Sequence, residues 1–440
     1  MPEQPFYMRG IFAPIDTEAT FDELEVRGEV PESLSGTFMR NGPNPIKGDP
    51  GHWFFGDGML HAVRLEGGRA TSYRNRYIKT PSYLGEDVQM VGPDGQINRH
   101  ATTANTHIVE HAGRVLALAE SAFPVEVTRD CDTVGPLDYD GVLETAFTAH
   151  PKFCHETGEM LAFGYSFLPP YLTFHRVDAS GKMVQSEVID VPGSTMMHDF
   201  AITRNHVLFL DLPLVFEMEQ ALAGNMPYVW SDDYGARIGV LPRGGGNADV
   251  KWIDIDPCYV VHTLNAFERD GQIVFDAARY AEFADVSFES GPGLMTRWTI
   301  DLDAGRVEEE TLDGRDCDFP RLDPRLEGRP NRYGYSVEFG HENAELQMKT
   351  LLKYDLDERR TEVHDFGQGV SPGEGVFAPT APDAGEDEGF VLAFTHDEND
   401  GASELQILDA QNFTGDPVAS IRIPQRVPVG FHGNWLPDAR

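Results

Sequence analysis

The chain has 440 residues, 40% of them hydrophobic, and carries a formal net charge of −37 from 72 acidic and 35 basic side chains. This excess of acid argues against a nucleic-acid partner, because binding to phosphates needs a basic face. The four cysteines form no CxxC pair, which leaves zinc ribbons and redox motifs unsupported and predicts free, buried thiols.

The first residues, MPEQPFYMRG, lack the basic-then-apolar pattern of a signal peptide. No stretch further along approaches the roughly 20 apolar residues that a membrane-spanning helix needs. We therefore expect a cytoplasmic protein.

Short strand-like runs separated by compact turns follow one another along the whole chain. Examples are HAVRL from His61, RVLALA from Arg114 and HVLFLDL from His206, with Gly, Asn and Asp at the turns between such runs. Helical periodicity is scarce, and we expect one short helix at most, within 214–222. Hairpins this numerous, without a fixed repeat, favour an all-β propeller over a single closed barrel.

Five longer connections interrupt the strand-like runs: 87–103, 168–171, 213–243, 279–293 and 319–332. Their Pro, Gly and aromatic content is typical of loops over one face, and no charge block marks a domain boundary. The sequence therefore predicts a single propeller domain over 1–440, with these loops as a cap.

Histidines recur at the start of strand-like runs, four to six residues before the next turn. These are His61, His107, His150, His198 and His262. In a propeller the first strand of each blade begins near the central axis, so such residues would converge there, and His432 could join them from a closing strand. Converging neutral imidazoles make a transition-metal site, whereas a single packed histidine would be structural. The remaining histidines are expected at the surface: His52, His100, His111, His155, His175, His206, His341, His364 and His396.

Eight motifs together resemble those of a known family, the carotenoid cleavage oxygenases, over nearly the whole chain. They are FMRNGPNP from Phe38, HWFFGDGMLH from His52, ANTHIVEHAGRVLALAE from Ala104, TAHPKF from Thr148, MMHDFAITRN from Met196, CDFPR from Cys317, PGEGVFAP from Pro372 and PQRVPVGFHGNW from Pro424. The resemblance implies a seven-bladed β-propeller with an axial non-haem Fe(II), capped by a dome of loops and short helices.

The resemblance also assigns the residues of the metal site. It implies iron ligands at His150, His198, His262 and His432, and carboxylates at Glu120 against His198, Asp318 against His262 and Glu374 against His432. His61 and His107 do not match the ligand positions. Carboxylates that accept a ring N–H fix the tautomer and offset the charge of the ion. Where the family commonly has Glu, this chain has the shorter Asp318, so either the backbone comes closer or a water bridges the gap.

The implied reaction is cleavage of a carbon–carbon double bond by O₂ into two carbonyl products, with one Fe(II) per chain and no organic cofactor. The Gly-rich run at 244–246 is no dinucleotide fingerprint. A polyene isomerase or hydrolase, and a non-catalytic propeller, remain as other readings. Neither the scissile bond nor the oligomeric state follows from the sequence.

The substrate class rests on two differences from the relatives that cleave stilbenes or isoeugenol. Those carry a Lys before the carboxylate that matches Glu120, whereas this chain has Ala119, and the loop tyrosine motif is also missing. We therefore expect a carotenoid or apocarotenoid, with a lignostilbene or isoeugenol-type alkene as the alternative if Tyr77, Lys79 or Tyr83 grips a phenol. Candidate walls of the substrate tunnel are Phe163, Tyr165, Phe167, Tyr171, Tyr228 and Trp230. The apolar segment FLPPYLTF from Phe167 could give a weak peripheral membrane contact.

Overall fold

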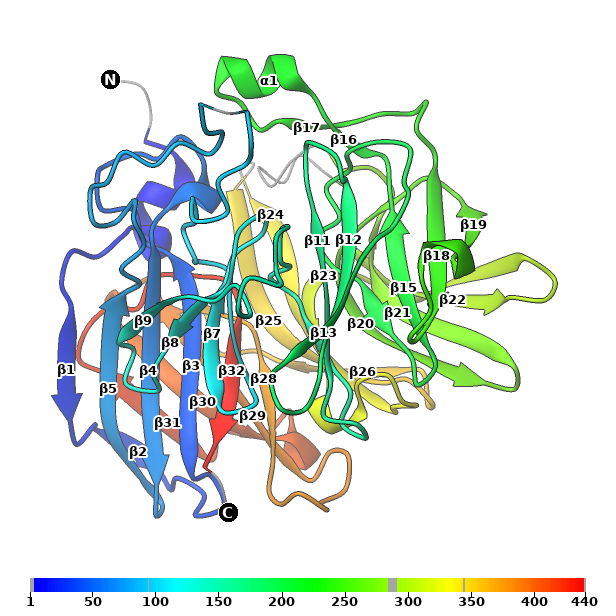
Figure 1. The fold of residues 1–440 in the computed structure, drawn as a ribbon. Helices are drawn as coiled ribbons and strands as arrows, with labels where there is room; N and C mark the ends of the chain where they lie inside the picture. Colours follow the sequence, from blue (N-terminus) through cyan, green and yellow to red (C-terminus); the bar gives the residue numbers. More distant parts are fainter. Residues whose placement is uncertain (1–3, 94, 284–290, 343–344, 439–440) are drawn as a thin grey trace. The chain divides into compact units, whose positions relative to one another are not determined.

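The computed structural model describes residues 4–93, 95–283, 291–342 and 345–438. These residues form antiparallel β-sheets, with a single α-helix, α1 (Met218–Ala223), among them (Figure 1). Glycines with positive φ close many hairpins, for example Gly67 at +55° and Gly271 at +81°, as expected for turn residues. The prediction of a nearly all-β fold is confirmed.

The chain divides by its contacts into two compact units. The first contains residues 1–138, 348–353 and 362–440, and the second contains residues 139–347 and 354–361. Because the first unit takes up both ends of the chain, strands far apart in sequence share its sheets.

The first unit contains three sheets. One has the order β1 (Ala19–Asp22), β5 (Arg69–Tyr77), β4 (Gly58–Glu66), β3 (Gly36–Pro43), β32 (Gly433–Pro437). Another has the order β2 (Val26–Gly28), β31 (Ala419–Ile423), β30 (Ser403–Asp409), β29 (Gly389–Asp397), β27 (Val370–Pro372), with β28 (Val376–Pro379) also on β29. The third is β6 (His107–His111), β7 (Arg114–Leu118), β8 (Val125–Val127), β9 (Thr133–Pro136). Pairing of β3 with β32 and of β2 with β31 ties the N-terminal strands to the C-terminal ones.

The second unit contains the sheets that carry most of the predicted site. Two four-stranded sheets are β10 (Lys152–Phe153), β11 (Met160–Tyr165), β12 (Leu172–Val177), β13 (Met183–Val188), and β14 (Ala201–Ile202), β15 (His206–Asp211), β18 (Ala236–Pro242), β19 (Lys251–Ile255). A larger sheet runs β20 (Tyr259–Arg269), β21 (Gln272–Tyr280), β22 (Leu294–Asp301), β23 (Arg306–Arg321), β24 (Tyr333–Glu342). Its path continues through β25 (Glu345–Asp355) and β26 (Arg360–His364), whose residues are shared between the two units.

The long connection expected at 213–243 is not a single loop. It contains, in chain order, strand β16 (Leu214–Phe216), helix α1, strand β17 (Tyr228–Trp230) and strand β18. β16 and β17 pair into a two-stranded sheet. The prediction missed β18 because its apolar run, ARIGVLP, was grouped with the Pro- and Gly-rich residues around it. The short helix expected within 214–222 is present but begins later, at Met218. Part of the connection expected at 279–293 lies outside the described residues, as 284–290 do.

Three histidines expected at the surface are buried instead: His175, His364 and His396. Each lies on a strand, and in two of them one ring nitrogen meets a backbone carbonyl oxygen: His175 Nε2 is 3.0 Å from that of Ala146, and His364 Nδ1 is 2.8 Å from that of Phe413. A buried imidazole is tolerated when a backbone acceptor takes its N–H. The four cysteines are free and buried, as predicted.

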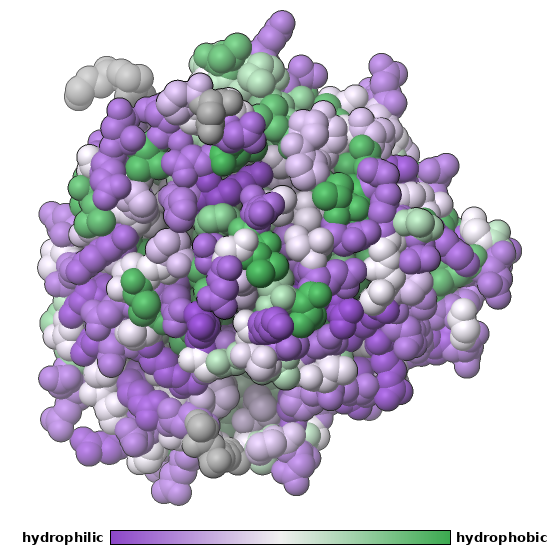
Figure 2. Space-filling view, viewed as in Figure 1, coloured by the Kyte–Doolittle hydropathy of each residue, from purple (hydrophilic) through white to green (hydrophobic). Residues whose placement is uncertain are grey.

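The face drawn in Figure 2 is mostly hydrophilic, with apolar side chains scattered in small groups. This matches the large acidic excess of the sequence. Within the described ranges, no helix has both the length and the apolar character to cross a membrane.

Candidate metal centre

Three of the predicted ligands lie where a strand begins or is interrupted. His150 stands two residues before β10 and His198 three residues before β14. His262 lies inside β20, where the register with β21 shifts between Val260 and Thr263. In each case the strand is at the end of its sheet, so the histidine has no neighbouring strand on one side. The position inferred from the turns, at the start of a terminal strand, is therefore close to that observed.

The three rings converge within the second unit. His198 Nε2 lies 3.0 Å from His150 Nε2 and 3.1 Å from His262 Nε2, and the three side chains belong to buried residues. At a typical imidazole–metal distance of about 2.1 Å, two nitrogens at right angles around one ion would be about 3.0 Å apart, against about 3.4 Å at the tetrahedral angle. The spacing fits adjacent corners of an octahedron, and the donor set suits a borderline divalent transition metal.

His262 is oriented by a carboxylate that contacts it directly. Its Nδ1 lies 2.8 Å from Asp318 Oδ1, which also accepts the backbone N–H of Phe319 at 2.7 Å. Phe319 has φ +53° and stacks on the His262 ring, with centroids 5.0 Å apart. This left-handed turn brings the short Asp318 side chain to the ring, so the contact needs no bridging water.

Tyr280 completes the hydrogen bonding of Asp318. Its hydroxyl donates to Asp318 Oδ2 at 2.6 Å, while Oδ1 faces His262. Burial, reinforced by the Asp318 charge, raises the pKa of Tyr280 well above its ordinary value, which keeps the hydroxyl a donor. The sequence reasoning missed Tyr280, which is 38 residues away at the end of β21.

His432, in the first unit, has a matching arrangement. Its Nδ1 lies 2.9 Å from Glu374 Oε1, and Glu374 Oε2 accepts the backbone N–H of Gly433 at 2.9 Å. His432 stands directly before β32 and is buried, as is Glu374. A carboxylate on Nδ1 makes that nitrogen the donor and leaves Nε2 as the lone-pair nitrogen.

The first unit also contains the two histidines that shared the strand position without matching a ligand. His61 Nδ1 lies 2.8 Å from the Tyr73 hydroxyl, and Asn434 Nδ2 donates to His107 Nε2 at 3.1 Å. The His61 ring thus meets a hydroxyl, and the His107 ring meets an amide. Glu120, the remaining predicted carboxylate, is half-buried two residues beyond β7.

Three of the six predicted tunnel residues form an aromatic cluster with Phe216 in the second unit. Tyr165 meets Tyr228 edge to face at 6.1 Å, Tyr228 meets Phe216 at 5.6 Å, and Phe216 stacks on Phe167 at 5.0 Å. Phe163 packs instead against Phe200 in the core of the unit. Tyr171 is half-buried beside the cluster's strands, and the Trp230 indole donates to Asp232. Phe216 was not predicted, because it lies in the segment expected to be a loop or helix.

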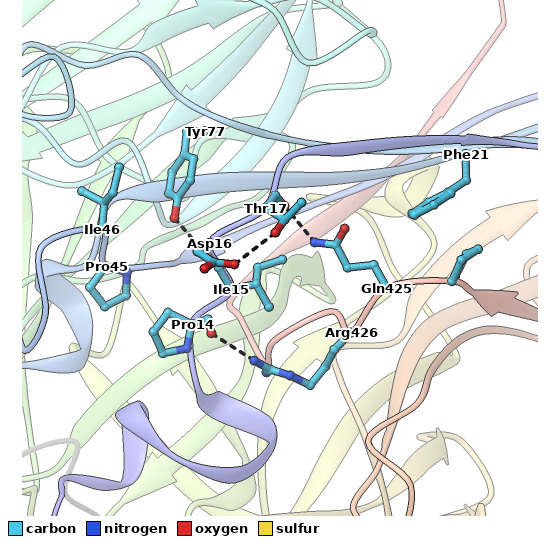
Figure 3. A pocket seen from close by; sticks show the side chains of 11 residues that line it. Pro14, Ile15, Asp16, Thr17, Phe21, Pro45, Ile46, Tyr77, Gln425 and Arg426 are labelled. Carbon is cyan, nitrogen blue, oxygen red and sulfur yellow. Dashed lines mark hydrogen bonds between the residues drawn. The ribbon is translucent and has the colours of Figure 1, made fainter.

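Tyr77, one of the residues that could grip a phenol, is engaged elsewhere. Its hydroxyl donates to the Ile15 carbonyl at 3.0 Å and accepts from Asn44, and burial raises its pKa to about 12. Figure 3 shows it at the edge of a pocket of about 630 Å³ in the first unit. The pocket is lined by Pro14, Ile15, Asp16, Thr17, Phe21, Pro45, Ile46, Tyr77, Pro424, Gln425 and Arg426.

Comparison with known proteins identifies the family. Residues 12–437 match the family model described as retinal pigment epithelial membrane protein. The chain is 38% identical to a carotenoid cleavage oxygenase of Mycobacterium tuberculosis, over 98% of this chain and 97% of that one, and 32% identical to an isoeugenol monooxygenase of Pseudomonas nitroreducens, over 97% of both. The crystal structure of the lignostilbene dioxygenase of Pseudomonas brassicacearum superposes with a TM-score of 0.89 at 30% identity, covering 99% of each chain. This chain therefore belongs to the family of the carotenoid cleavage oxygenases and is an oxygenase.

Proposed function

We propose that this protein is a non-haem Fe(II) dioxygenase that cleaves a double bond of an apolar conjugated alkene with O₂, giving two carbonyl products. The observation that carries the proposal is the trio of buried imidazoles whose Nε2 atoms lie 3.0 and 3.1 Å apart. Such a set holds a divalent ion without adding negative charge from thiolate or carboxylate ligands.

The proposed ligands are His150, His198, His262 and His432, holding one Fe(II) ion per chain. His432 is included because its ring is prepared like that of His262, with a carboxylate on Nδ1 and Nε2 left to bind. Four ligands in an octahedral arrangement leave two positions open, whereas a structural zinc site is closed and usually rich in cysteine.

The carboxylates have a defined task in this site. Asp318 and Glu374 hold the Nδ1 protons of His262 and His432, and Glu120 is proposed to do the same for His198. Their negative charges offset the 2+ charge that neutral imidazoles leave uncompensated, and they prevent the rings from turning. When bound, the ion supplies a place where O₂ is activated next to the alkene. No organic cofactor is needed, because O₂ and the alkene provide all the electrons.

The aromatic cluster of Tyr165, Phe167, Tyr228 and Phe216 is proposed to line the path of the alkene, with Tyr171 and Trp230 nearby. Phe163 is better assigned to the core, given its packing on Phe200. An apolar aromatic wall excludes water and orients a conjugated chain by stacking.

We favour a carotenoid or apocarotenoid as substrate over a phenolic stilbene. The residue before Glu120 is Ala119, which offers no charge to a phenolate, and the Tyr77 hydroxyl is already bound to Asn44 and Ile15. A phenol gripped by neither group would forgo charge-assisted hydrogen bonds of about 1.5–3 kcal/mol each. The relatives named for isoeugenol and lignostilbene keep this alternative open.

The proposed architecture is one domain, a seven-bladed propeller with a cap of loops. Supporting it, β23 pairs through its first half with β22 and through its last residues with β24, as one strand would when passing between two blades. Counting that sheet as two blades, with the other sheets of four or more strands, gives seven. The cytoplasm as the place of action rests on the sequence alone.

The test is incubation of the iron-loaded protein with a panel of apocarotenoids and stilbenes, with and without O₂, followed by mass measurement of the products. Dioxygenase activity predicts two aldehydes or ketones per substrate, each with one oxygen from O₂, and no product without it. Turnover that persists without O₂ would instead identify an isomerase or hydrolase. Protein that contains no iron and needs none of its four histidines would be a binding propeller.

A further inference from the structure

A second cluster of polar side chains lies directly behind the three histidines of the second unit. Each of these three histidines is followed within two residues by one member of the cluster: Lys152 after His150, Asp199 after His198 and Thr263 after His262. Asp199 and Thr263 directly follow their ligands, and because successive side chains of an extended segment point to opposite sides, they face away from the histidine rings. Lys152 stands two residues after His150, and the contacts of its long side chain bring it to the same pair.

Asp199 is the centre of this cluster. Its Oδ2 accepts both the backbone N–H of Thr263 at 2.8 Å and the Thr263 hydroxyl at 2.9 Å, and its Oδ1 accepts the backbone N–H of Phe200 at 2.7 Å. Lys152 Nζ lies 2.9 Å from Asp199 Oδ1 and donates to Thr263 Oγ1 at 3.1 Å. One carboxylate thus joins the three segments that carry His150, His198 and His262.

Glu327 extends the cluster to a fourth segment. Its Oε2 accepts the backbone N–H of Phe153, the residue next to Lys152 in β10. Burial raises the pKa of Glu327, while the charge of Lys152 opposes the change. β10 is thus tied to Asp199 through Lys152 and to Glu327 through the backbone of Phe153.

The burial of the pair argues that its value is geometric. The side chains of Lys152 and Asp199 are only 12% and 2% exposed. Removing two charges from water costs about as much as their attraction returns, so a buried ion pair is weak evidence for stability and better evidence for a fixed arrangement. Three ligands from three separate segments must keep their nitrogens within about 0.5 Å of the productive positions to hold an ion well.

We propose that Lys152, Asp199 and Thr263 are positioning residues that set the spacing of the three histidines, and hence the affinity and geometry of the metal site. The proposal rests on the proposed function, since it presumes that these histidines bind an ion. Asp199 accepts the backbone N–H of Thr263 and so holds the β20 backbone beside His262. Lys152, on β10, contacts both Asp199 and Thr263.

The experiment is a titration of the metal-free, full-length protein with Co(II), whose ligand-field absorption reports the coordination geometry. Lys152→Met is expected to bind Co(II) about 10- to 100-fold more weakly, as for other partners of metal ligands, with altered bands. Thr263→Val, which removes one hydroxyl at nearly constant volume, should shift both readouts in the same direction by less. Lys152→Arg keeps the charge and should recover most of the affinity.

The matched control is Arg297→Met. Arg297 forms an equally buried pair with Asp276, 11% and 0% exposed and 2.7 Å apart, on strands β21 and β22, which carry no proposed ligand. This variant should be less stable to urea yet bind Co(II) as the original chain does. Wild-type affinity and spectrum in both Lys152→Met and Thr263→Val would overturn the proposal; if the former does not fold, Thr263→Val alone decides. Failure of the original chain to bind Co(II) would instead overturn the metal site itself.

Discussion

Two buried histidines, one in each unit, are held by carboxylates in different ways. In the second unit Asp318 reaches His262 at 2.8 Å and gives its other oxygen to the Tyr280 hydroxyl. In the first unit Glu374 reaches His432 at 2.9 Å and gives its other oxygen to the backbone of Gly433, the residue after the histidine. The ring contact is the same, but the second carboxylate oxygen is held by a side chain in one unit and by the main chain in the other.

The difference follows from the length of the acidic side chain. Glu374 spans from its own segment to both the ring and the main chain of the neighbouring segment, so it fixes the whole start of β32. Asp318 is one methylene shorter and reaches the ring through the left-handed turn at Phe319. The oxygen that faces the ring, Oδ1, also accepts the backbone N–H of Phe319. Asp318 relies on Tyr280 for its second oxygen. A carboxylate of either length can therefore orient a ring, but the shorter one depends on an additional residue.

The largest expected effect comes from removing the rings themselves. His262→Ala and His432→Ala should each lose stoichiometric iron and all measurable alkene cleavage, because a site with three ligands binds the ion weakly and opens a further position. Metal analysis of the purified protein and product masses check this. Equal loss from both units would show that the two differently supported histidines serve one ion.

The control for that experiment is His61→Ala. His61 is as buried as the proposed ligands, but its ring partner is the Tyr73 hydroxyl. This variant should lower the free energy of unfolding and still contain iron. Iron lost from His61→Ala, or kept in His432→Ala, would contradict the proposed ligand set.

The next largest effect is expected from the carboxylates. Asp318→Asn and Glu374→Gln replace a charged acceptor by an amide and should each weaken metal binding by about 10- to 100-fold. Glu374 holds the backbone of a distant segment at Gly433, whereas Asp318 holds the backbone only of its own next residue, Phe319, so the Glu374 variant should lose more stability than the Asp318 variant. Metal titration together with urea unfolding of both proteins would separate the two contributions. Equal loss of stability in the two variants would count against the distinction between main-chain and side-chain support.

A smaller effect is expected from Tyr280→Phe, which removes only the hydroxyl on Asp318 Oδ2. A hydrogen bond to a charged group contributes about 1.5–3 kcal/mol, so stability should fall by about that amount. Metal affinity should fall less than in Asp318→Asn, because the contact with His262 remains. Asp318→Glu should be harmful with Tyr280 present and less so with Tyr280→Phe, since the longer side chain needs the space of the hydroxyl. If Asp318→Glu is equally harmful with Tyr280 and with Tyr280→Phe, the proposed dependence of the Asp318 position on the Tyr280 hydroxyl is wrong.

The sequence predicted the all-β fold well, because hairpin turns and alternating runs are local signals. It also located candidate histidines, since His150, His198 and His262 all lie at the start or interruption of a terminal strand. The position predicted from the turns did not separate them from His61 and His107, although in the structure His61 lies inside β4, between β5 and β3. What distinguishes His150, His198 and His262 is that their rings meet one another, and the three come from distant segments that no local pattern connects.

The rest of the site depended on tertiary contacts in the same way. The sequence allows two contacts between Asp318 and His262, a direct one or one through a bridging water. The turn at Phe319, which no local pattern predicts, makes the contact direct. Tyr280 and Phe216 were missed because their importance comes from what they meet, not from a motif around them. Lys152 and Asp199 lie inside motifs that carry the resemblance, and Thr263 directly follows a predicted ligand, yet the contacts among the three appear only once their segments are assembled.

The smallest effect on the metal site is expected from His175, a buried histidine whose ring meets a backbone carbonyl where the rings of His262 and His432 meet a carboxylate. This ring is fully buried against Phe147 and bonded to the Ala146 carbonyl, and burial lowers its pKa to about 4 from 6.5. Its neutral form therefore favours the folded state fully above pH 6.5, and this contribution is lost as the pH falls from 6.5 towards 4. The loss between pH 7 and 5 should be about 2 kcal/mol. In His175→Gln, urea unfolding at the two pH values should differ by that much less than in the original chain, with iron content unchanged. A variant that keeps the full pH dependence would mean that other buried groups, such as His396, with its pKa lowered to about 3, carry the acid sensitivity.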